Sequence, residues 1–464
     1  MSRFRMPLLV LLGLVVGAIA LVIALRPQAS VGQGERVPPS WLQPPADVRA
    51  MLQAVSAESL ERYDRGLVGF GTRHTLSSQD DPNRGIGAAR DWIKAEFDKI
   101  AATSSGRMTV ELDGFIQQPV PRVPVPTRIT NVVATLHGTD PTSADRVYIV
   151  GAHYDSRVTD VLNATSDAPG ANDDASGTSA VLELARVFAA HPAEATIVFV
   201  AFAGEEQGLL GSEHLAQVAK AGGWNIQGVL NMDIIGSPIG GNGFREPRAI
   251  RLLNEGVPTA ETAQQTSRRQ SLGGENDGVS RQLARYVEET GENGATAMDV
   301  KLIYRRDRFG RGGDQISFLL RGWPAVRFSE PNENFDHQHQ DVRVEDGRQF
   351  GDLIEFVDFD YLARVTRVIG SSLAALARSP RAPGNVRIPT ALSYDADVSW
   401  NASPESDVVG YEVVWRDSID QRWTHSREVG TVTTATIENL NKDNFQIGVR
   451  AIDRDGNRSP VATP

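Results

Sequence analysis

The feature that most constrains the fold is the alternation of short apolar, β-rich runs with helical stretches between Ala46 and Leu376. Continuous apolar runs are typical of strands buried on both faces, and the helices between them serve as crossover connections. This pattern predicts an α/β domain with a mixed, largely parallel sheet flanked by helices. The clearest strands are expected over Ile129–Leu136, Arg146–Ala152, Thr196–Ala201 and Gly228–Met232, and helices over Ser176–Ala190 and Gly208–Ala221.

Breaks in this pattern divide the chain into parts. The stretch from Arg378 to Gly384 contains two prolines and interrupts any regular structure. Residues 237–294 are rich in Gly, Asn and Glu and indicate a loop-rich insertion around a helix near Val279–Glu289, a lid or specificity segment. The predicted parts are an N-terminal signal-anchor or signal peptide over 1–27, a linker over 28–45, the main domain over 46–377, a second linker over 378–384 and a β-sandwich over 385–464.

The N-terminus predicts export. Arg3 and Arg5 precede an uncharged run of twenty residues from Met6 to Leu25, which as a helix would cross a hydrocarbon layer roughly 30 Å thick. We favour an uncleaved signal-anchor; the alternative is a long signal peptide cut near Ala29–Ser30. The folded part is therefore expected outside the cytoplasm, anchored to the membrane and facing the periplasm or exterior, or secreted if the segment is cleaved.

Charge and cysteine content exclude several classes of protein. The formal net charge of −11 argues against a nucleic-acid partner, because phosphate neutralisation needs a dense Lys/Arg surface. A small-molecule or peptide partner fits better. The absence of cysteine excludes disulfides, thiolate nucleophiles and thiolate metal sites, so any metal must be held by His and carboxylate side chains.

Residues 385–464 carry alternating strand patterns separated by turn residues, at the spacing of an antiparallel sandwich. The strings Asp397–Trp400, Gly410–Trp415 and Phe445–Asp453 resemble a fibronectin type III module, for which we expect a spacing or docking role. Strands are predicted over Ala396–Trp400, Tyr411–Arg416, Thr431–Ile437 and Asn444–Ile452.

Side chains able to bind a metal are concentrated in five short segments, each of which follows a predicted strand or precedes a predicted helix. Because ligands of open α/β sheets bind at the carboxyl ends of the strands, we expect these segments to meet at one edge. The segments are Gly151–Ser156, Gly170–Gly177, Phe202–Gly208, Leu230–Asp233 and Asn334–Asp341.

Each segment alone has an ordinary explanation. His153 and Asp155 share one face of a strand and are as readily a surface pair. Adjacent Glu205 and Glu206 repel each other unless a cation or a shared proton relieves the repulsion, but acids before a helix also interact with its dipole. Five acid-rich segments at one sheet edge, however, favour a metal centre over five independent caps or turns.

In order and spacing, these segments resemble the zinc-dependent exopeptidase family that includes secreted bacterial leucyl aminopeptidases, glutamate carboxypeptidases and glutaminyl cyclases. The resemblance covers roughly Leu60 to Leu376 and includes Gly69–His74 and Arg84–Arg90 upstream. It implies the zinc exopeptidase, phosphorylase-hydrolase-like fold. It also implies the aminopeptidase branch with two zinc ions as cofactors.

Carried over residue by residue, the resemblance implies that Asp173 bridges the two zinc ions. His153 and Asp233 would complete one site, and Glu206 with a late histidine would complete the other. A cis peptide bond after the bridging aspartate is common in this family, so Asp173–Asp174 is expected to be cis.

Two histidines lie in the loop expected to supply the late ligand. His337 keeps a spacing to Asp341 seen in many relatives, whereas His339 lies further past the stretch Glu333–Phe335, as in others. We prefer His339 and keep His337 as the alternative. The sequence also has Gly313-Asp-Gln315 where Ser-Asp-His is common in relatives, which leaves Asp314 with either a substrate-side role or a cap or turn role.

The resemblance assigns two further carboxylates to catalysis. Glu205 would be the general base acting on a water that bridges the metals, and Asp155 would orient His153. The predicted function is hydrolysis of the N-terminal peptide bond of peptides. The alternatives are a carboxypeptidase or dipeptidase, which would use Arg305, Arg306, Arg308 or Arg311 for a substrate carboxylate, and then a glutaminyl cyclase or a non-catalytic receptor-type ectodomain. The sequence gives no indication of oligomeric state.

Overall fold

The computed structural model describes residues 43–464. The predicted export segment at 1–27 and most of the predicted linker at 28–45 lie outside the described residues. Between residues 43 and 464, no helix is both long enough and apolar enough to cross a membrane.

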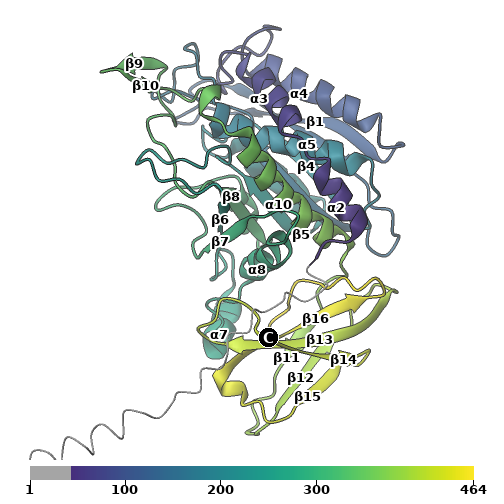
Figure 1. Cartoon of the computed structure of the whole chain (residues 1–464). Coiled ribbons are helices and arrows are strands. Elements are labelled where there is room, and N and C mark those ends of the chain that lie inside the picture. Colours follow the sequence, from purple (N-terminus) through teal and green to yellow (C-terminus); the bar gives the residue numbers. More distant parts are fainter. Residues whose placement is uncertain (1–42) are drawn as a thin grey trace, which may run out of the picture. The chain divides into compact units, whose positions relative to one another are not determined.

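The main domain is built on one eight-stranded sheet with the strand order β1-β2-β4-β3-β5-β8-β6-β7 (Figure 1). Neighbours β4, β3, β5 and β8 run parallel to one another, as do β6 and β7, whereas the pairs β1–β2, β2–β4 and β6–β8 are antiparallel. The predicted mixed, largely parallel sheet is confirmed. The strands are β1 (Met108–Gln117), β2 (Thr127–Leu136), β3 (Arg146–His153), β4 (Thr196–Phe202), β5 (Asn225–Met232), β6 (Ala249–Leu253), β7 (Asp299–Ile303) and β8 (Ala325–Ser329).

Helices cover both faces of this sheet (Figure 1). Along β4, Phe199 packs into a large core with α3, α4, α5, α8 and α10, while Val198 and Val200 pack on the other face with α6 and α9. This division follows from the alternation of side chains along a strand. The helices are α2 (Ala46–Gln53), α3 (Ala57–Val68), α4 (Ile86–Ala101), α5 (Ser176–Ala189), α6 (Leu210–Ala221), α7 (Ala263–Leu272), α8 (Val279–Gly291), α9 (Gln315–Leu319) and α10 (Phe359–Arg378).

The segment 237–294 contains more regular structure than its sequence predicts. Besides the expected helix, now α8, it holds helix α7 and strand β6, which pairs antiparallel with β8 inside the central sheet. β6 has only five residues with Arg251 at its centre, so its apolar signal is short and interrupted. Farther along the chain, β9 (Arg343–Glu345) and β10 (Arg348–Phe350) form a small separate hairpin.

The C-terminal residues form two three-stranded antiparallel sheets with a core of their own, which includes Trp400, Tyr411 and Val449. Strands occur at all four ranges expected from the sequence. The fibronectin type III assignment stays a prediction. The strands are β11 (Gly384–Arg387), β12 (Ala396–Asn401), β13 (Val408–Asp417), β14 (His425–Gly430), β15 (Thr434–Ile437) and β16 (Phe445–Asp453).

Buried ion pairs join these strands to α8. Asp277, just before α8, pairs with Arg285 on that helix at 2.9 Å and with Arg416 on β13 at 2.6 Å, and all three side chains are buried. The hydroxyl of Tyr286 donates to the backbone oxygen of Arg458 at 2.9 Å. The contact between α8 and the sandwich is therefore polar as well as buried.

Candidate metal centre

Neighbouring strands deliver most of the candidate side chains to one edge of the sheet. β3 ends at His153, Asp233 directly follows β5, and Glu205 and Glu206 lie in the turn after β4. His339 comes from the loop that follows β8. Because β4, β3, β5 and β8 are parallel neighbours, their carboxyl ends bring these residues together, as the sequence predicts.

Asp173, just before α5, lies between two groups of possible ligands. Its Oδ1 is 3.2 Å from Nε2 of His153, which in turn lies 3.8 Å from Oδ2 of Asp233. Its Oδ2 is 2.8 Å from Nε2 of His339, which lies 2.9 Å from Oε1 of Glu206. Each group of three offers one atom per residue, and the three atoms lie within 4.8 Å of one another. Asp173 thus belongs to both groups, one through each oxygen.

The donor atoms fit zinc. Both groups consist of imidazole nitrogen and carboxylate oxygen, ligands that zinc accepts in the absence of thiolates. The Oε1 atom of Glu206 is buried and accepts no hydrogen bond from the described residues, although it points at His339. An unsatisfied buried carboxylate oxygen is costly, and a cation bound by Glu206, Asp173 and His339 would relieve that cost.

The electrostatics of these residues also favour a cation. Burial opposes charge on His339, but Glu206 and Asp173 outweigh it and raise the pKa of His339 to about 10. Burial likewise opposes charge on Asp173, yet His339 and His153 hold the pKa of its carboxyl well below the usual range. These groups therefore stabilise positive charge between them, which a divalent ion supplies in full.

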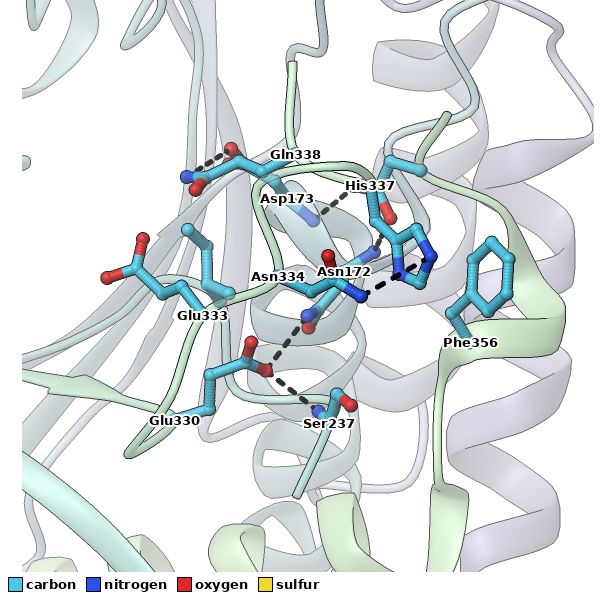
Figure 2. A pocket seen from close by; sticks show the side chains of 11 residues that line it. Asn172, Asp173, Ser237, Glu330, Glu333, Asn334, His337, Gln338 and Phe356 are labelled. Atoms are coloured by element: carbon cyan, nitrogen blue, oxygen red, sulfur yellow. Dashed lines mark hydrogen bonds between the residues drawn. The ribbon is translucent and has the colours of Figure 1, made fainter. Parts of the chain in front are cut away.

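The two histidines of the late loop have different surroundings. His339 faces Asp173 and Glu206, as described above. His337 instead stacks on Phe356, with ring centroids 3.6 Å apart, and its Nε2 lies 3.4 Å from the side-chain amide of Asn334 (Figure 2). The structure therefore brings His339, and not His337, into the cluster.

Asp155 contacts both the histidine and the two glutamates. Its backbone oxygen lies 3.1 Å from Nδ1 of His153, and its Oδ1 lies 3.6 Å from the same atom. Its carboxylate also accepts hydrogen bonds from the backbone N–H groups of Glu205 and Glu206, at 3.2 and 3.1 Å, and from the hydroxyl of Thr75 at 3.0 Å. Asp155 thus fixes the turn after β4 as well as the imidazole ring.

Glu205 differs from the other carboxylates of the cluster. Within residues 43–464 its carboxylate makes no hydrogen bond or ion pair. Burial raises the pKa of Glu205 well above its ordinary value, and His153 opposes that rise. A carboxylate with a raised pKa and no fixed partner is suited to proton transfer near neutral pH.

A pocket adjoins Asp173 on the side of the late loop (Figure 2). The amide of Gln338 donates to Oδ2 of Asp173 at 3.2 Å. Deeper in the pocket, Oε2 of Glu330 accepts hydrogen bonds from the side chain of Asn172 and the backbone N–H of Ser237, both at 2.9 Å. The peptide bond Asp173–Asp174 is cis, as predicted.

Several residues around the centre were not predicted. Arg157 and Arg327 form ion pairs with Glu206 and Asp233, and Asp352 accepts hydrogen bonds from the backbone of Asp173. Gln338 was likewise missed. The sequence holds one usable signal for these residues, namely a charged side chain, Arg327, inside the otherwise apolar run Ala325–Phe328.

Asp314 is buried at the start of α9, and its side chain does not cap that helix. Burial raises the pKa of Asp314 to about 7, and His153 opposes the rise. Of the arginines considered for a substrate carboxylate, Arg308 and Arg311 both pair with Glu333, at 3.2 and 3.1 Å.

A mixed α/β sheet with a buried His/carboxylate cluster at the carboxyl ends of its parallel strands is typical of a metal-dependent enzyme. Residues 131–345 match the family model Peptidase family M28. The chain is 50% identical over 445 residues to a probable zinc metalloprotease of Pyrenophora teres f. teres, a match that covers 95% of this chain and 90% of the relative. It is also 49% identical over 422 residues to one of Leptosphaeria maculans, with 91% and 97% covered.

The chain therefore belongs to peptidase family M28, and the prediction of a zinc metallopeptidase acting on peptides is confirmed at that level. Among solved structures, the LapA aminopeptidase of Legionella pneumophila aligns with 20% identity and a TM-score of 0.48, over 71% of this chain and 74% of that one. A glutaminyl cyclase of Macrostomum lignano aligns with 17% identity and a TM-score of 0.49, over 71% and 92%.

Proposed function

We propose that this protein is an exported aminopeptidase with two zinc ions, in which His153, Asp173 and Asp233 hold one ion and Asp173, Glu206 and His339 hold the other. The observation that carries the proposal is the position of Asp173, whose two oxygens face two separate sets of ligand atoms. Two zinc ions bound here would polarise the scissile carbonyl and lower the pKa of a water molecule between them.

Glu205 is the proton-transfer group of the proposed mechanism. Its carboxylate has no partner in the described part of the chain, and its neighbour Glu206 is a proposed ligand. Glu205 would therefore be free to reach a water activated by the bound zinc ions. It accepts the proton of the attacking water and delivers it to the leaving amine. Asp155 keeps Glu205 in place through the backbone N–H.

An N-terminal rather than C-terminal specificity is supported by the charges beside the centre. The pocket next to Asp173 is lined by Glu330 and Asp352, and also by Glu333, whose charge its arginine partners offset; no Lys or Arg is among its described lining residues. Such a pocket suits a substrate ammonium better than a carboxylate. Arg308 and Arg311, the best candidates for binding a carboxylate, are already paired with Glu333.

The test combines a zinc count with three substrates on the purified full chain: an aminoacyl anilide, an N-terminally blocked peptide and a C-terminally blocked peptide. We expect two zinc ions per chain and cleavage of all but the N-terminally blocked peptide. Glu205→Gln should keep both ions and lose about three orders of magnitude in kcat. Glu58→Gln, exposed on α3, serves as the matched control. Normal turnover of Glu205→Gln, or cleavage only of the N-terminally blocked peptide, refutes the proposal.

The proposal of export rests on the apolar segment Met6–Leu25. The assignment of residues 385–464 to a known type of module rests on their two sheets, which pack around Trp400 and Tyr411. We propose a signal-anchor for the first and a fibronectin type III module for the second. Fusing residues 1–45 to a phosphatase that is active only outside the cytoplasm tests the export proposal, since an inactive fusion contradicts it.

A further inference from the structure

Two arginines lie behind the two carboxylates that are not shared between the ligand groups. Nη2 of Arg327 is 2.7 Å from Oδ1 of Asp233, and Nε of Arg157 is 2.8 Å from Oε2 of Glu206. The other oxygen of each carboxylate faces a histidine. Oδ2 of Asp233 lies 3.8 Å from Nε2 of His153. Oε1 of Glu206 lies 2.9 Å from Nε2 of His339. Each carboxylate therefore has one oxygen toward the centre and one beside an arginine. Arg157 donates a hydrogen bond to Glu206, whereas Arg327 and Asp233 form an ion pair without hydrogen-bond geometry.

We propose that Arg327 and Arg157 are positioning residues that restrict Asp233 and Glu206 to binding a metal through one oxygen each. The proposal rests on the two-zinc centre proposed above. A carboxylate that is free to rotate can bind a cation through both oxygens and fill an additional coordination position. Catalytic zinc sites keep a position open for water or substrate, and the two arginines protect that position.

Arg327 is held firmly enough for this role. Its side chain is fully buried, and a second carboxylate, Asp307, lies 3.3 Å from its Nη1, which also donates to the backbone oxygen of Gly312 at 2.8 Å. In the sheet, Arg327 on β8 pairs with Asn231 on β5. Asp233 comes two residues after Asn231, and alternate residues of a strand point to the same face. The strand register thus places the guanidinium against the proposed ligand.

Arg157 reaches the second carboxylate from the loop after β3. Its side chain is 16% exposed, and its Nη1 donates to the backbone oxygen of Val158 at 3.1 Å. Its Nη2 also lies 2.5 Å from Nδ1 of His339. A guanidinium only donates, and an imidazole that gives Nε2 to a metal carries its proton on Nδ1. The contact with Nδ1 is therefore incompatible with a metal-bound His339, and the proposal rests on the contact of Arg157 with Glu206 alone.

A guanidinium suits this position because it stays ionised when buried and so attracts the carboxylate oxygen beside it. Asp173, Asp233 and Glu206 bring three carboxylates and their negative charge into one buried space. The two arginines offset part of that charge from outside the ligand shell, so the carboxylates keep their orientation before any metal arrives.

The test uses the full chain loaded with cobalt(II), whose visible absorption weakens as its coordination number rises. We expect Arg327→Met and Arg157→Met to bind two cobalt ions per chain, with the absorption of the affected ion reduced about two-fold. Arg157→Lys should stay close to wild type because an ammonium can still hold one oxygen. Arg321→Met, which removes a similarly half-buried arginine paired with Glu213 on α6, is the matched control.

Unchanged spectra in folded, fully loaded Arg327→Met and Arg157→Met overturn the proposal. Loss of a cobalt ion from a folded variant also overturns it, because the arginine would then create the site rather than limit its ligands. If Arg327→Met fails to fold because Asp307 loses one of its two arginine partners, the double variant Arg327→Met/Asp307→Asn replaces it. The Arg157 variants, at a more exposed position, test the proposal independently. A wild-type count other than two cobalt ions refutes the two-metal centre itself and is thereby distinguished from failure of the arginine proposal.

Discussion

The buried ion pairs of Asp277 allow a quantitative prediction about how the sandwich and α8 stabilise each other. The carboxylate accepts from Arg285 at 2.9 Å and from Arg416 at 2.6 and 2.9 Å, and it also accepts from the side chain of Gln282 at 3.0 Å. Asp277→Ala leaves two buried guanidinium groups without the carboxylate that neutralises them.

The expected cost follows from these contacts. Removing one partner of a buried ion pair costs about 3–5 kcal/mol. Both arginines keep other acceptors, since Arg285 donates to the backbone oxygen of Gln421 and Arg416 to that of Asp420, each at 2.7 Å. Because these bonds remain, we expect Asp277→Ala to lower the free energy of unfolding by about 3 kcal/mol, the lower end of that range.

The assay is denaturant unfolding followed by tryptophan fluorescence, since Trp423 lies 5.2 Å from the guanidinium of Arg416. A double-mutant cycle with Arg416→Met isolates the pair, and we expect a coupling energy of about 2 kcal/mol. Glu438→Ala, exposed on the sandwich, is the control. A loss below about 1 kcal/mol for Asp277→Ala, or additive single variants, would refute the reasoning that this carboxylate couples the two elements.

Three further predictions concern the centre and the charge balance of the fold. His339→Ala should lower the zinc count per chain, measured by atomic emission, whereas His337→Ala should leave it unchanged; the reverse pattern would reverse the ligand assignment. Treatment with a strong chelator should lower Tm by calorimetry, because the buried carboxylates lose the cations that offset their repulsion, and an unchanged Tm would contradict a zinc-filled centre. Burial, together with two nearby aspartates, raises the pKa of Glu194 to about 7, so its charge costs stability in the folded state. That cost is absent below the ordinary pKa of a glutamate and complete above about pH 7. Glu194→Gln should therefore stabilise the protein at pH 8 by about 1 kcal/mol, allowing for its partial exposure to solvent, and have little effect at pH 4; equal effects at both pH values would show that its charge is not the cause.

The parts of the fold that the sequence predicts are those with strong local periodicity. β2, β3, β4 and β5 are buried on both faces, so they read as continuous apolar runs and agree with the predicted ranges to within three residues at each end. β1 was not predicted because polar residues such as Glu111 and Asp113 interrupt it. β6 was missed for the related reason that Arg251 divides a five-residue strand.

For the site, the strand-end motifs identify the possible ligands but not what surrounds them. His153, Asp173 and Asp233 were found because each lies in a short acid-rich segment beside a predicted strand or helix. Arg157 and Arg327 were not, because a charged residue gives no sign of which carboxylate it will face. Their partners depend on the register between β5 and β8 and on the path of the loop after β3.

The position of Asp173 between the two ligand groups has a thermodynamic consequence. If each of its oxygens holds one zinc ion, the two binding equilibria are linked: the first ion orients the carboxylate for the second and at the same time withdraws electron density from it. A zinc titration of this protein should then not follow two independent isotherms. Substitution at this one residue should abolish both steps together, whereas substitution of His153 or His339 should leave one step in place.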